Sequence, residues 1–469
     1  MTVVNERSDT AADAVQRAFD RAAGTHSIAG NEVALLIDGP DTFAAMLAQI
    51  AGARRRVHLE NYIIRDDATG QRFAQQLAER ARAGVAVRVL YDWFGSIGTA
   101  ASFWRELRAA GVEVCAFGPP RLRDPLVFLS RDHRKVLVVD GERGVVGGLC
   151  LGDEWMGNPA KGRQPWRDTA VALSGPAARI LDGMFCRAWT FAGGADPDAA
   201  ELAPAVEPAG DVAVRIVATE PGRERAYRMV DLLIGMSGSR IWLTEAYLVT
   251  PQRMFQALQD AARDGADVRL LLPGTSDVRV LRNFARVGYR ALLRAGVRIW
   301  EWRGPMLHAK TIVADSRWVS VGSSNLNPSS LLANWELDIF VAGEPLAQAM
   351  EARYVADVEQ SSEVLLRPRW IPSVFGRPVP PALTRSRPPA PATSTEMSFQ
   401  ERRRRAIVLL SGVLFGARAA LFGPFAVGLL AVGVLFAVFP VPMAWLAAGV
   451  AALASASLAS RAVGHRRRG

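Results

Sequence analysis

The stretch LHAKTIVAD carries three ionisable side chains in an apolar run, those of His308, Lys310 and Asp315. On a strand, side chains alternate between two faces, so the imidazole of His308 and the ammonium of Lys310 share one face. Together they can face one phosphate, with the histidine as nucleophile or general acid and the lysine neutralising phosphoryl oxygens. One H-x-K-x4-D match is weak evidence, because a lone histidine in an apolar run is more often a structural residue.

A second copy, DHRKVLVVD, carries His133, Lys135 and Asp140 at the same spacing. The composition argues against coincidence. The chain has three lysines, and two of them follow a histidine by two residues, whereas almost every other positive charge is an arginine. A compact ammonium and a planar guanidinium are not interchangeable where a phosphate is gripped closely. Two H-x-K units set against each other provide a nucleophile and a general acid, and this chemistry requires no metal or other cofactor.

Other polar residues near the motifs are candidates for supporting roles. A neutral attacking imidazole needs its other nitrogen held by an acceptor, and Asp168 and Glu336 follow the two motifs at similar distances. Ser323 and Asn325 stand just after the glycine that follows the second motif, and both can donate to phosphate. The aspartates of the two motifs are either catalytic or structural caps of the turns that follow, and their position favours the structural role slightly.

The motifs lie in an internal repeat. RRRVHLENYII corresponds to GSRIWLTEAYL, and RFAQQLAERARAGVAVRVLYD corresponds to MFQALQDAARDGADVRLLLPG. Each half predicts strand, amphipathic helix, strand, helix, strand and then the motif strand. Such alternation is typical of an α/β fold with a mostly buried sheet. We therefore expect two α/β/α sandwich halves related by a pseudo-twofold axis, so that the two motifs form one pocket.

Composition also predicts the domain organisation of the 469 residues. In chain order the parts are an N-terminal segment (1–29), a first half (30–194), a linker rich in Ala and Pro (195–211), a second half (212–367), a Pro-rich tether (368–400) and a membrane region (401–469). The tether is expected to be extended, because proline prevents regular structure.

The C-terminal part predicts a membrane anchor. Residues 419–439 and 443–459 are uncharged apolar runs separated by PVP, and the first is long enough to cross a bilayer. Arginine runs at 402–405 and 466–468 place both outer ends in the cytoplasm. Residues 406–417 are too short to span and are interpreted as an interfacial helix. We expect a transmembrane helical hairpin; the alternative is a buried helical pair in a soluble domain.

The charge of the chain indicates an anionic partner. The formal net charge is +10, which fits either nucleic acid or an anionic membrane surface. Because the arginine runs flank apolar stretches, lipid is favoured. Cys115, Cys150 and Cys186 have neither the number of a disulfide framework nor the spacing of a zinc site. No metal site is expected.

The doubled H-x-K-x4-D-x6-G pattern resembles the phospholipase D superfamily. The surrounding YDWFGSIG, RDHRKVLVVDG, PWRDT, PGTSD, AGVRIWEW and GSSNLNPSSLLANWELDI are similar to motifs of bacterial cardiolipin synthases, from about residue 31 to 367. The resemblance implies two phospholipase D-like halves and a metal-independent phosphatidyl transfer. It also implies that His133 takes the phosphatidyl group as a phosphohistidine. His308 would then protonate the departing glycerol and deprotonate the incoming hydroxyl.

The resemblance further implies anionic phospholipid substrates, phosphatidylglycerol above all, and a place in the bacterial inner membrane with the catalytic part in the cytoplasm. Some relatives use phosphatidylethanolamine, and no nucleic acid partner is expected. One departure stands out: Cys150 replaces the asparagine of the family pattern, which the second copy keeps as Asn325. Two alternatives stay open, a phospholipase D-type phosphodiesterase acting on lipid or, less favoured, nucleic acid, and a lipid-binding scaffold with a decayed site. The oligomeric state is also open.

Overall fold

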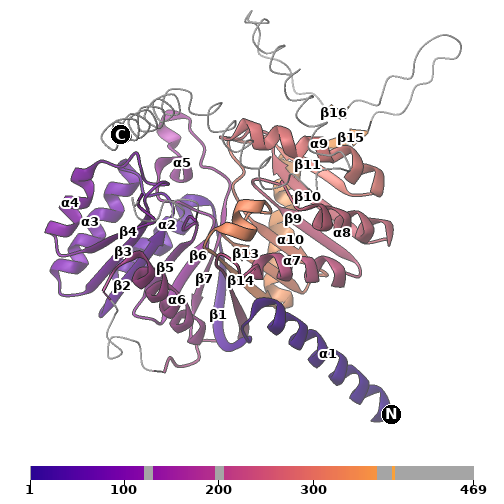
Figure 1. Cartoon of the computed structure of the whole chain (residues 1–469), viewed down its shortest axis with the longest axis horizontal. Coiled ribbons are helices and arrows are strands. Elements are labelled where there is room, and N and C mark those ends of the chain that lie inside the picture. Colours follow the sequence, from indigo (N-terminus) through magenta and orange to yellow (C-terminus); the bar gives the residue numbers. More distant parts are fainter. Residues whose placement is uncertain (1, 121–129, 196–204, 367–382, 386–469) are drawn as a thin grey trace, which may run out of the picture. The chain divides into compact units, whose positions relative to one another are not determined.

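The structure, a computed structural model, describes residues 2–120, 130–195, 205–366 and 383–385. After an N-terminal helix, α1 (Thr2–Ala23), strands and helices alternate through two halves (Figure 1). The first half contains β1 (Ile28–Ile37), α2 (Asp38–Ala51), β2 (Arg56–Asn61), α3 (Ala68–Arg82), β3 (Ala86–Asp92), α4 (Ala101–Ala109), β4 (Glu113–Phe117), β5 (Lys135–Val139), β6 (Arg143–Gly147), α5 (Asp153–Met156), a 3₁₀ turn (Pro159–Lys161), β7 (Thr169–Ser174) and α6 (Pro176–Ala192). The second half contains β8 (Val212–Thr219), α7 (Arg225–Met236), β9 (Arg240–Thr244), α8 (Gln252–Arg263), β10 (Asp267–Pro273), α9 (Arg279–Ala295), β11 (Arg298–Trp302), β12 (Thr311–Ala314), β13 (Trp318–Gly322), a π-helical turn (Ser329–Ala333), β14 (Glu336–Ala342), α10 (Glu344–Glu359), β15 (Ser361–Leu366) and β16 (Leu383–Arg385).

The described strands form one sheet of 16, in the order β4-β3-β2-β5-β6-β7-β1-β8-β14-β13-β12-β9-β10-β11-β15-β16. Outward from the central antiparallel pair of β1 and β8, the two sides repeat the same order up to β4 and β11. In each half three strands are parallel, β2-β3-β4 and β9-β10-β11, and the motif strands β5 and β12 run antiparallel to β2 and β9. Each motif strand therefore begins beside the carboxyl ends of parallel strands, where ligands bind in α/β folds.

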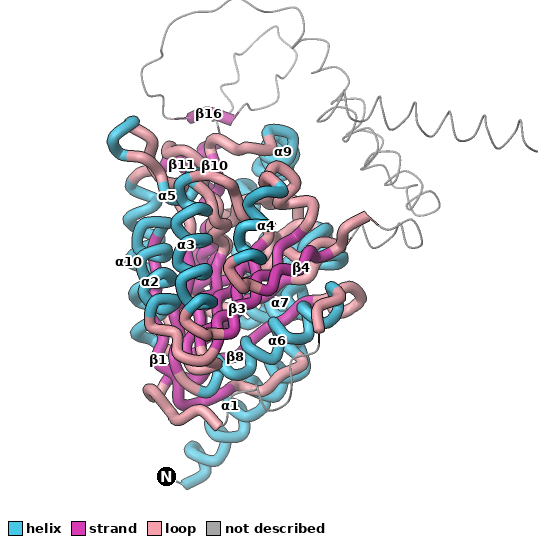
Figure 2. Tube along the Cα trace, turned by 90° about the vertical axis from the view of Figure 1, so that its left-hand side faces the viewer, coloured by secondary structure: helices cyan, strands magenta, loops and turns pink. Residues whose placement is uncertain are grey.

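Helices pack against both half-sheets, and α6 and α10 each contact strands of both halves. In the first half, α2, α3 and α4 bury Phe43, Phe73 and Trp104 in one cluster, and Figure 2 shows α2 and α3 in front of the strands. In the second half, α7, α8 and α9 build the corresponding cluster. A third cluster joins Leu181 of α6 and Tyr354 of α10 to strands of both halves, so the halves share a core. The predicted two-half α/β architecture is confirmed.

Helix α1 packs on the second half, a contact that the sequence pattern did not predict. Phe19 is fully buried, with its ring centroid 4.8 Å from that of Trp318 and 4.9 Å from that of Phe340. Asp20 forms an ion pair with the buried Arg215. The C-terminal end of α1, within the expected N-terminal segment, is thus packed on the second half.

Most of the expected tether and all of the expected membrane region lie outside the described residues, including the hairpin at 419–439 and 443–459. Three residues of the tether are described and form β16, which pairs antiparallel with β15. These three residues therefore do not lack regular structure, contrary to the expectation. Among the helices that the structure describes, none has the length and apolar character needed to cross a membrane.

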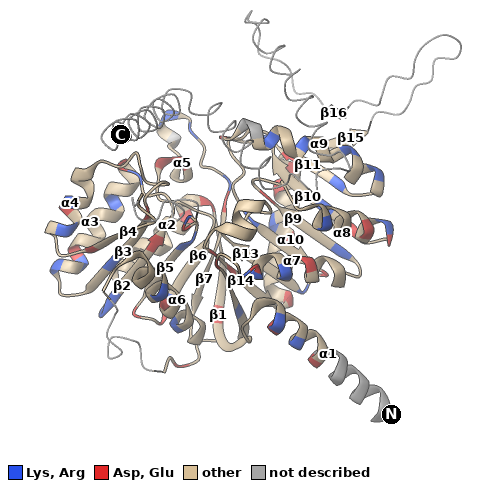
Figure 3. Ribbon diagram, in the orientation of Figure 1, with Lys and Arg blue, Asp and Glu red and all other residues tan. Residues whose placement is uncertain are grey.

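Positions of Lys and Arg occur on the outer helices of both halves (Figure 3). α9 carries five arginines and no acidic residue. The two arginine runs on which the preference for lipid was based lie outside the described residues.

Candidate active site at the junction of the two halves

Each motif histidine lies just before its strand, where its backbone pairs with the opposite half. The amide of His133 donates to the carbonyl of Trp335 at 2.9 Å, and the amide of His308 donates to the carbonyl of Arg167 at 2.7 Å. Trp335 and Arg167 each stand one residue before a candidate carboxylate. This reciprocal pairing brings the two motifs together and fixes the register between the halves.

The carboxylates are exchanged between the halves. His133 donates from Nδ1 to Oε2 of Glu336 at 3.0 Å, and His308 donates from Nδ1 to Oδ2 of Asp168 at 2.7 Å. Both carboxylates are fully buried. Because an ionised carboxylate only accepts hydrogen bonds, the proton of each neutral ring must be on Nδ1. Nε2 of each ring is then left with a lone pair for chemistry.

Burial keeps both imidazoles neutral at pH 7. Burial and the charge of Lys310 lower the pKa of His308 to about 4, against the opposing effect of Asp168. Burial also lowers the pKa of His133, although Glu336 opposes the change. A neutral imidazole is the form that can attack phosphorus.

The two carboxylates remain ionised in spite of their burial. Burial alone would raise the pKa of Asp168, but the neighbouring His308 and Lys310 lower it below its ordinary value. The pKa of Glu336 is likewise lowered, because the effect of His133 and its neighbours exceeds that of burial. Each can therefore stabilise an imidazolium that forms during a reaction.

The motif lysines are buried and act on both halves. Each donates from Nζ to the carbonyl of its own motif histidine, and each ammonium lies over a ring, Lys135 over Tyr62 at 5.1 Å and Lys310 over Tyr247 at 6.0 Å. Burial lowers the pKa of Lys310 to about 8, so this group is still mostly charged at pH 7. Each lysine also lowers the pKa of the opposite half's histidine, so the charges of both lysines act on both motifs.

Comparison with known proteins identifies the family. Residues 46–154 and 231–357 match the family model described as cardiolipin synthase, PLD-like domain. The chain is 33% identical over 353 residues to a cardiolipin synthase of Halalkalibacterium halodurans, covering 72% of this chain and 69% of the relative. The chain belongs to the phospholipase D-like cardiolipin synthase family. The resemblance inferred from the motifs is confirmed.

A further relative supports this membership in the cardiolipin synthase family, and a solved structure shares the fold. Cardiolipin synthase A of Pseudomonas entomophila is 34% identical over 357 residues, covering 75% of this chain and 73% of the relative. The crystal structure of phosphatidylserine synthase from Haemophilus influenzae aligns with a TM-score of 0.59 over 74% of this chain and 91% of that chain. At 13% identity, the second likeness shows the fold alone.

In this member of the cardiolipin synthase family, Ser323 binds the carboxylate of Glu336, whereas the sequence predicted that it would bind phosphate. Its hydroxyl donates to Oε2 of Glu336 at 2.6 Å, and its carbonyl lies 3.1 Å from Nδ1 of His133. Asn325 is buried, and its Oδ1 accepts no hydrogen bond among the described residues. Cys150 is buried as well, and burial raises the pKa of its thiol, which argues against a nucleophilic thiolate.

Aromatic side chains that sequence reasoning assigned to the core, or did not consider, lie against the histidines. The ring centroid of Tyr62 is 4.9 Å from that of His133, and the centroid of Tyr247 is 6.1 Å from that of His308. Trp155 approaches His308 edge-on at 5.4 Å. The repeat contained a signal for the two tyrosines, because Tyr62 and Tyr247 follow corresponding strands of the two copies, β2 and β9.

The aspartates of the two motifs hold turns at the far ends of their strands. Asp140 accepts hydrogen bonds from the amides of residues 54–56 at 2.8–3.0 Å, and Asp315 accepts from the amides of residues 238–240 at 2.9 Å. Both have positive φ, 57° and 50°. Since β5 and β12 separate them from the histidines, we replace the catalytic assignment of these aspartates by a structural one.

Alanine in place of Asp140 should destabilise the protein without impairing the chemistry. Three amides would lose their acceptor, so the free energy of unfolding should fall by about 2–3 kcal/mol. Specific activity well below the unfolding transition should stay within about twofold, as expected for a structural residue. Denaturant unfolding and activity of the full chain, with Asp140→Asn as the matched variant that keeps one acceptor oxygen, check this. A stable Asp140→Ala protein without activity would restore the catalytic assignment.

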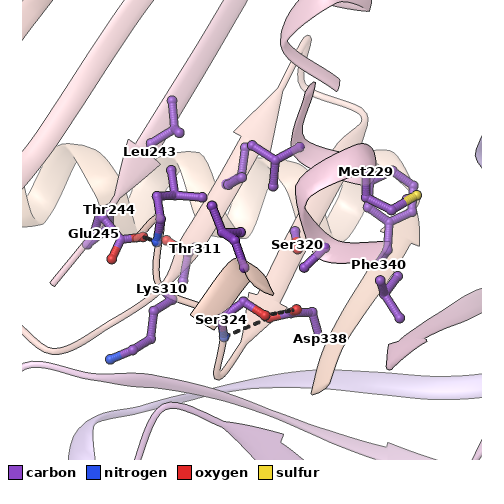
Figure 4. Close-up of a pocket in the computed structure, with 16 residues that line it drawn as sticks. Met229, Leu243, Thr244, Glu245, Lys310, Thr311, Ser320, Ser324, Asp338 and Phe340 are labelled. Carbon is purple, nitrogen blue, oxygen red and sulfur yellow. Dashed lines mark hydrogen bonds between the residues drawn. The ribbon is translucent and has the colours of Figure 1, made fainter. Parts of the chain in front are cut away.

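A small cavity adjoins Lys310 in the second half (Figure 4). Its volume of about 30 Å³ suits one or two water molecules and is far too small for an acyl chain. Ser324 donates to Asp338 at its edge, and burial raises the pKa of Asp338 and of Glu245 to about 7. Among the described residues, no group of three or more His, Cys, Asp or Glu side chains could hold a metal ion.

Proposed function

We propose that this protein joins two phosphatidylglycerol molecules to give cardiolipin and glycerol. The observation that carries the proposal is the reciprocal pair of motifs, in which each histidine is held by a buried carboxylate of the other half. The curated relatives that match most of the chain are cardiolipin synthases, which supports the same activity.

In the first step, Nε2 of His133 attacks the phosphorus of the donor lipid. The bond between phosphorus and the head-group glycerol oxygen breaks, and that oxygen takes the proton from Nε2 of His308. Glycerol leaves, and the phosphatidyl group is bound to His133 as a phosphohistidine. Lys135 and Lys310 neutralise the phosphoryl oxygens while negative charge develops on them.

His308 must be protonated to act as an acid, although its pKa is about 4 in the unliganded protein. The charge of Lys310 contributes to that low value. A phosphodiester anion bound between the two lysines offsets their charges, so it should raise the pKa of His308. Binding of the substrate would therefore favour the protonated form of His308, which can donate its proton to the leaving oxygen.

In the second step, His308 is neutral and accepts the proton of the incoming hydroxyl. The resulting oxygen nucleophile attacks the phosphorus, the bond to Nε2 of His133 breaks, and cardiolipin is released. His308 is again protonated for the next donor. The same chemistry with water as acceptor would yield phosphatidic acid, so hydrolysis is the alternative function, and phosphatidylethanolamine is the alternative lipid partner.

We propose further that the chain works at the bacterial inner membrane, anchored by residues 419–439 and 443–459. The length of the first run and the flanking arginines support this arrangement, with the two halves in the cytoplasm. Anchoring would hold the site near its lipid substrates.

The test uses full-length protein in mixed micelles, with a chelator and phosphatidylglycerol labelled separately in head group and acyl chains. Cardiolipin and free glycerol released in equal amounts would support the proposed transfer. Phosphatidic acid as the single lipid product would make the protein a hydrolase. A parallel reaction with added phosphatidylethanolamine measures the preference for the acceptor.

A further inference from the structure

The two histidine–carboxylate pairs share one geometry but differ in the group that holds the carboxylate. In the second half, Oε2 of Glu336 accepts from His133 and also from the hydroxyl of Ser323 at 2.6 Å. In the first half, Oδ2 of Asp168 accepts from His308 and also from Nε1 of Trp155 at 3.1 Å. One oxygen is shared by a histidine and one further donor in each case.

The first half has no room for the serine of the second. Gly147 and Gly322 mark the same place in the two motifs, so Gly148 stands where Ser323 stands. A Cβ at Gly148 would lie 2.2 Å from Oδ1 of Asp168, which excludes any side chain there. A side-chain donor to Asp168 that plays the part of Ser323 must therefore come from elsewhere in the chain.

Trp155 is buried and closely packed, so its indole N–H has a fixed position beside Asp168. It is 1% exposed and lies on α5, the short helix after the first motif. A Cβ at Gly39 would lie 2.1 Å from the carbonyl oxygen of Trp155, so the glycine lets α2 approach α5 closely. The indole also packs against Trp166, with ring centroids 4.7 Å apart.

We infer that Trp155 is a positioning residue for His308, and that it acts through Asp168 as Ser323 acts through Glu336 on His133. The inference deepens the proposed function, because it concerns the histidine that moves protons in both steps. An indole N–H only donates and cannot rotate away from the ring, whereas a serine hydroxyl also accepts and turns. Asp168 is thereby fixed as an acceptor, and Nδ1–H of His308 stays in place while Nε2 gains and loses its proton.

Trp155→Phe removes the N–H and keeps most of the ring. Loss of a group that orients a catalytic residue lowers activity by about 10- to 100-fold. We expect kcat of Trp155→Phe to fall by this factor, and KM to change by less than about twofold. Trp104→Phe is the matched control, since Trp104 is buried in the same core cluster as Trp155 and packs on Tyr91. Benzothienylalanine at position 155, which replaces N–H by sulfur at nearly constant shape, tests the same loss where phenylalanine leaves a cavity.

The readout that separates positioning from packing is the titration of the histidines, followed by NMR of ring-labelled full-length protein, which has five histidines. Without the indole donor, Asp168 stabilises the imidazolium more strongly, so the pKa of His308 should rise by about one pH unit. The pKa of His133 should stay unchanged in the Trp155 variants. In Ser323→Ala the pKa of His133 should rise instead, and the pKa of His308 should stay unchanged. Lys310, Lys135 and Asp168, which also set the pKa of His308, remain in place in every variant.

An unchanged pKa of His308 in both Trp155 variants, with activity no lower than in Trp104→Phe, would overturn the inference. The titration needs no substrate. The inference can therefore fail while cardiolipin is still formed, and it can hold even where the product assay gives phosphatidic acid.

Discussion

Alanine at position 133 is expected to abolish cardiolipin formation, with a loss of about 10⁴-fold or more. His133 is the proposed nucleophile. Without it the phosphohistidine cannot form, so neither glycerol release nor transfer to the second lipid can follow. His308 cannot replace it, because its Nδ1 is bound to Asp168 and its Nε2 is committed to proton transfer. The loss of activity in His133→Ala should therefore exceed the loss caused by replacing Glu336 or Trp155, which act through a histidine.

The roles of the two histidines can be separated with an activated donor. Phosphatidyl-p-nitrophenol has a leaving group that departs without a proton, so the first step no longer needs a general acid. His308→Ala should then release one nitrophenolate per active site and retain the phosphatidyl group as an acid-labile adduct on His133. His133→Ala should show neither the burst nor the adduct.

The reverse pattern, with the adduct on His308 and a burst from His133→Ala, would exchange the two roles. Absence of a burst in both variants would contradict the phosphohistidine pathway. The natural lipid serves as the internal comparison, because its glycerol oxygen needs a proton and both variants should be inactive with it.

The repeat made the fold predictable from the sequence. The predicted order of strand, helix, strand, helix, strand and motif strand appears as β2, α3, β3, α4, β4 and β5, and again as β9, α8, β10, α9, β11 and β12. The central pairing of β1 with β8 was not predictable in this way, since neither strand contains a motif. Helix α1 was missed because its docking depends largely on Phe19 and on the partners that the second half presents.

The sequence singled out the two histidines and the two carboxylates that the structure brings together, but it did not predict how they are connected. Asp168 and Glu336 emerged as carboxylates at matching distances from the motifs. Which histidine each one holds depends on how the two halves pair, and the structure exchanges them. Trp155 gave no signal of its own, because its contact with Asp168 matters only once the steric exclusion at Gly148 is known.

Glutamine at position 336 is expected to lower the rate of cardiolipin formation by about 10²- to 10⁴-fold while the fold is retained. The amide has the size of the carboxylate, and its Oε1 can still accept from Nδ1 of His133. In the place of Oε2 the amide oxygen can also still accept from the hydroxyl of Ser323, so both hydrogen bonds survive. What is lost is the negative charge that stabilises the imidazolium during attack, and the pKa of His133 should fall further.

Asp338→Asn is the matched control for that charge loss, because Asp338 is also buried and lies two residues further along β14. Its pKa is raised to about 7 by burial, so much of it is already neutral at pH 7, and the asparagine variant should keep activity within about fivefold. A Glu336→Gln protein as active as Asp338→Asn would show that orientation of His133 is enough and that the carboxylate charge contributes little. A large difference between the two variants would locate the electrostatic stabilisation in the single carboxylate that reaches His133 from the opposite half.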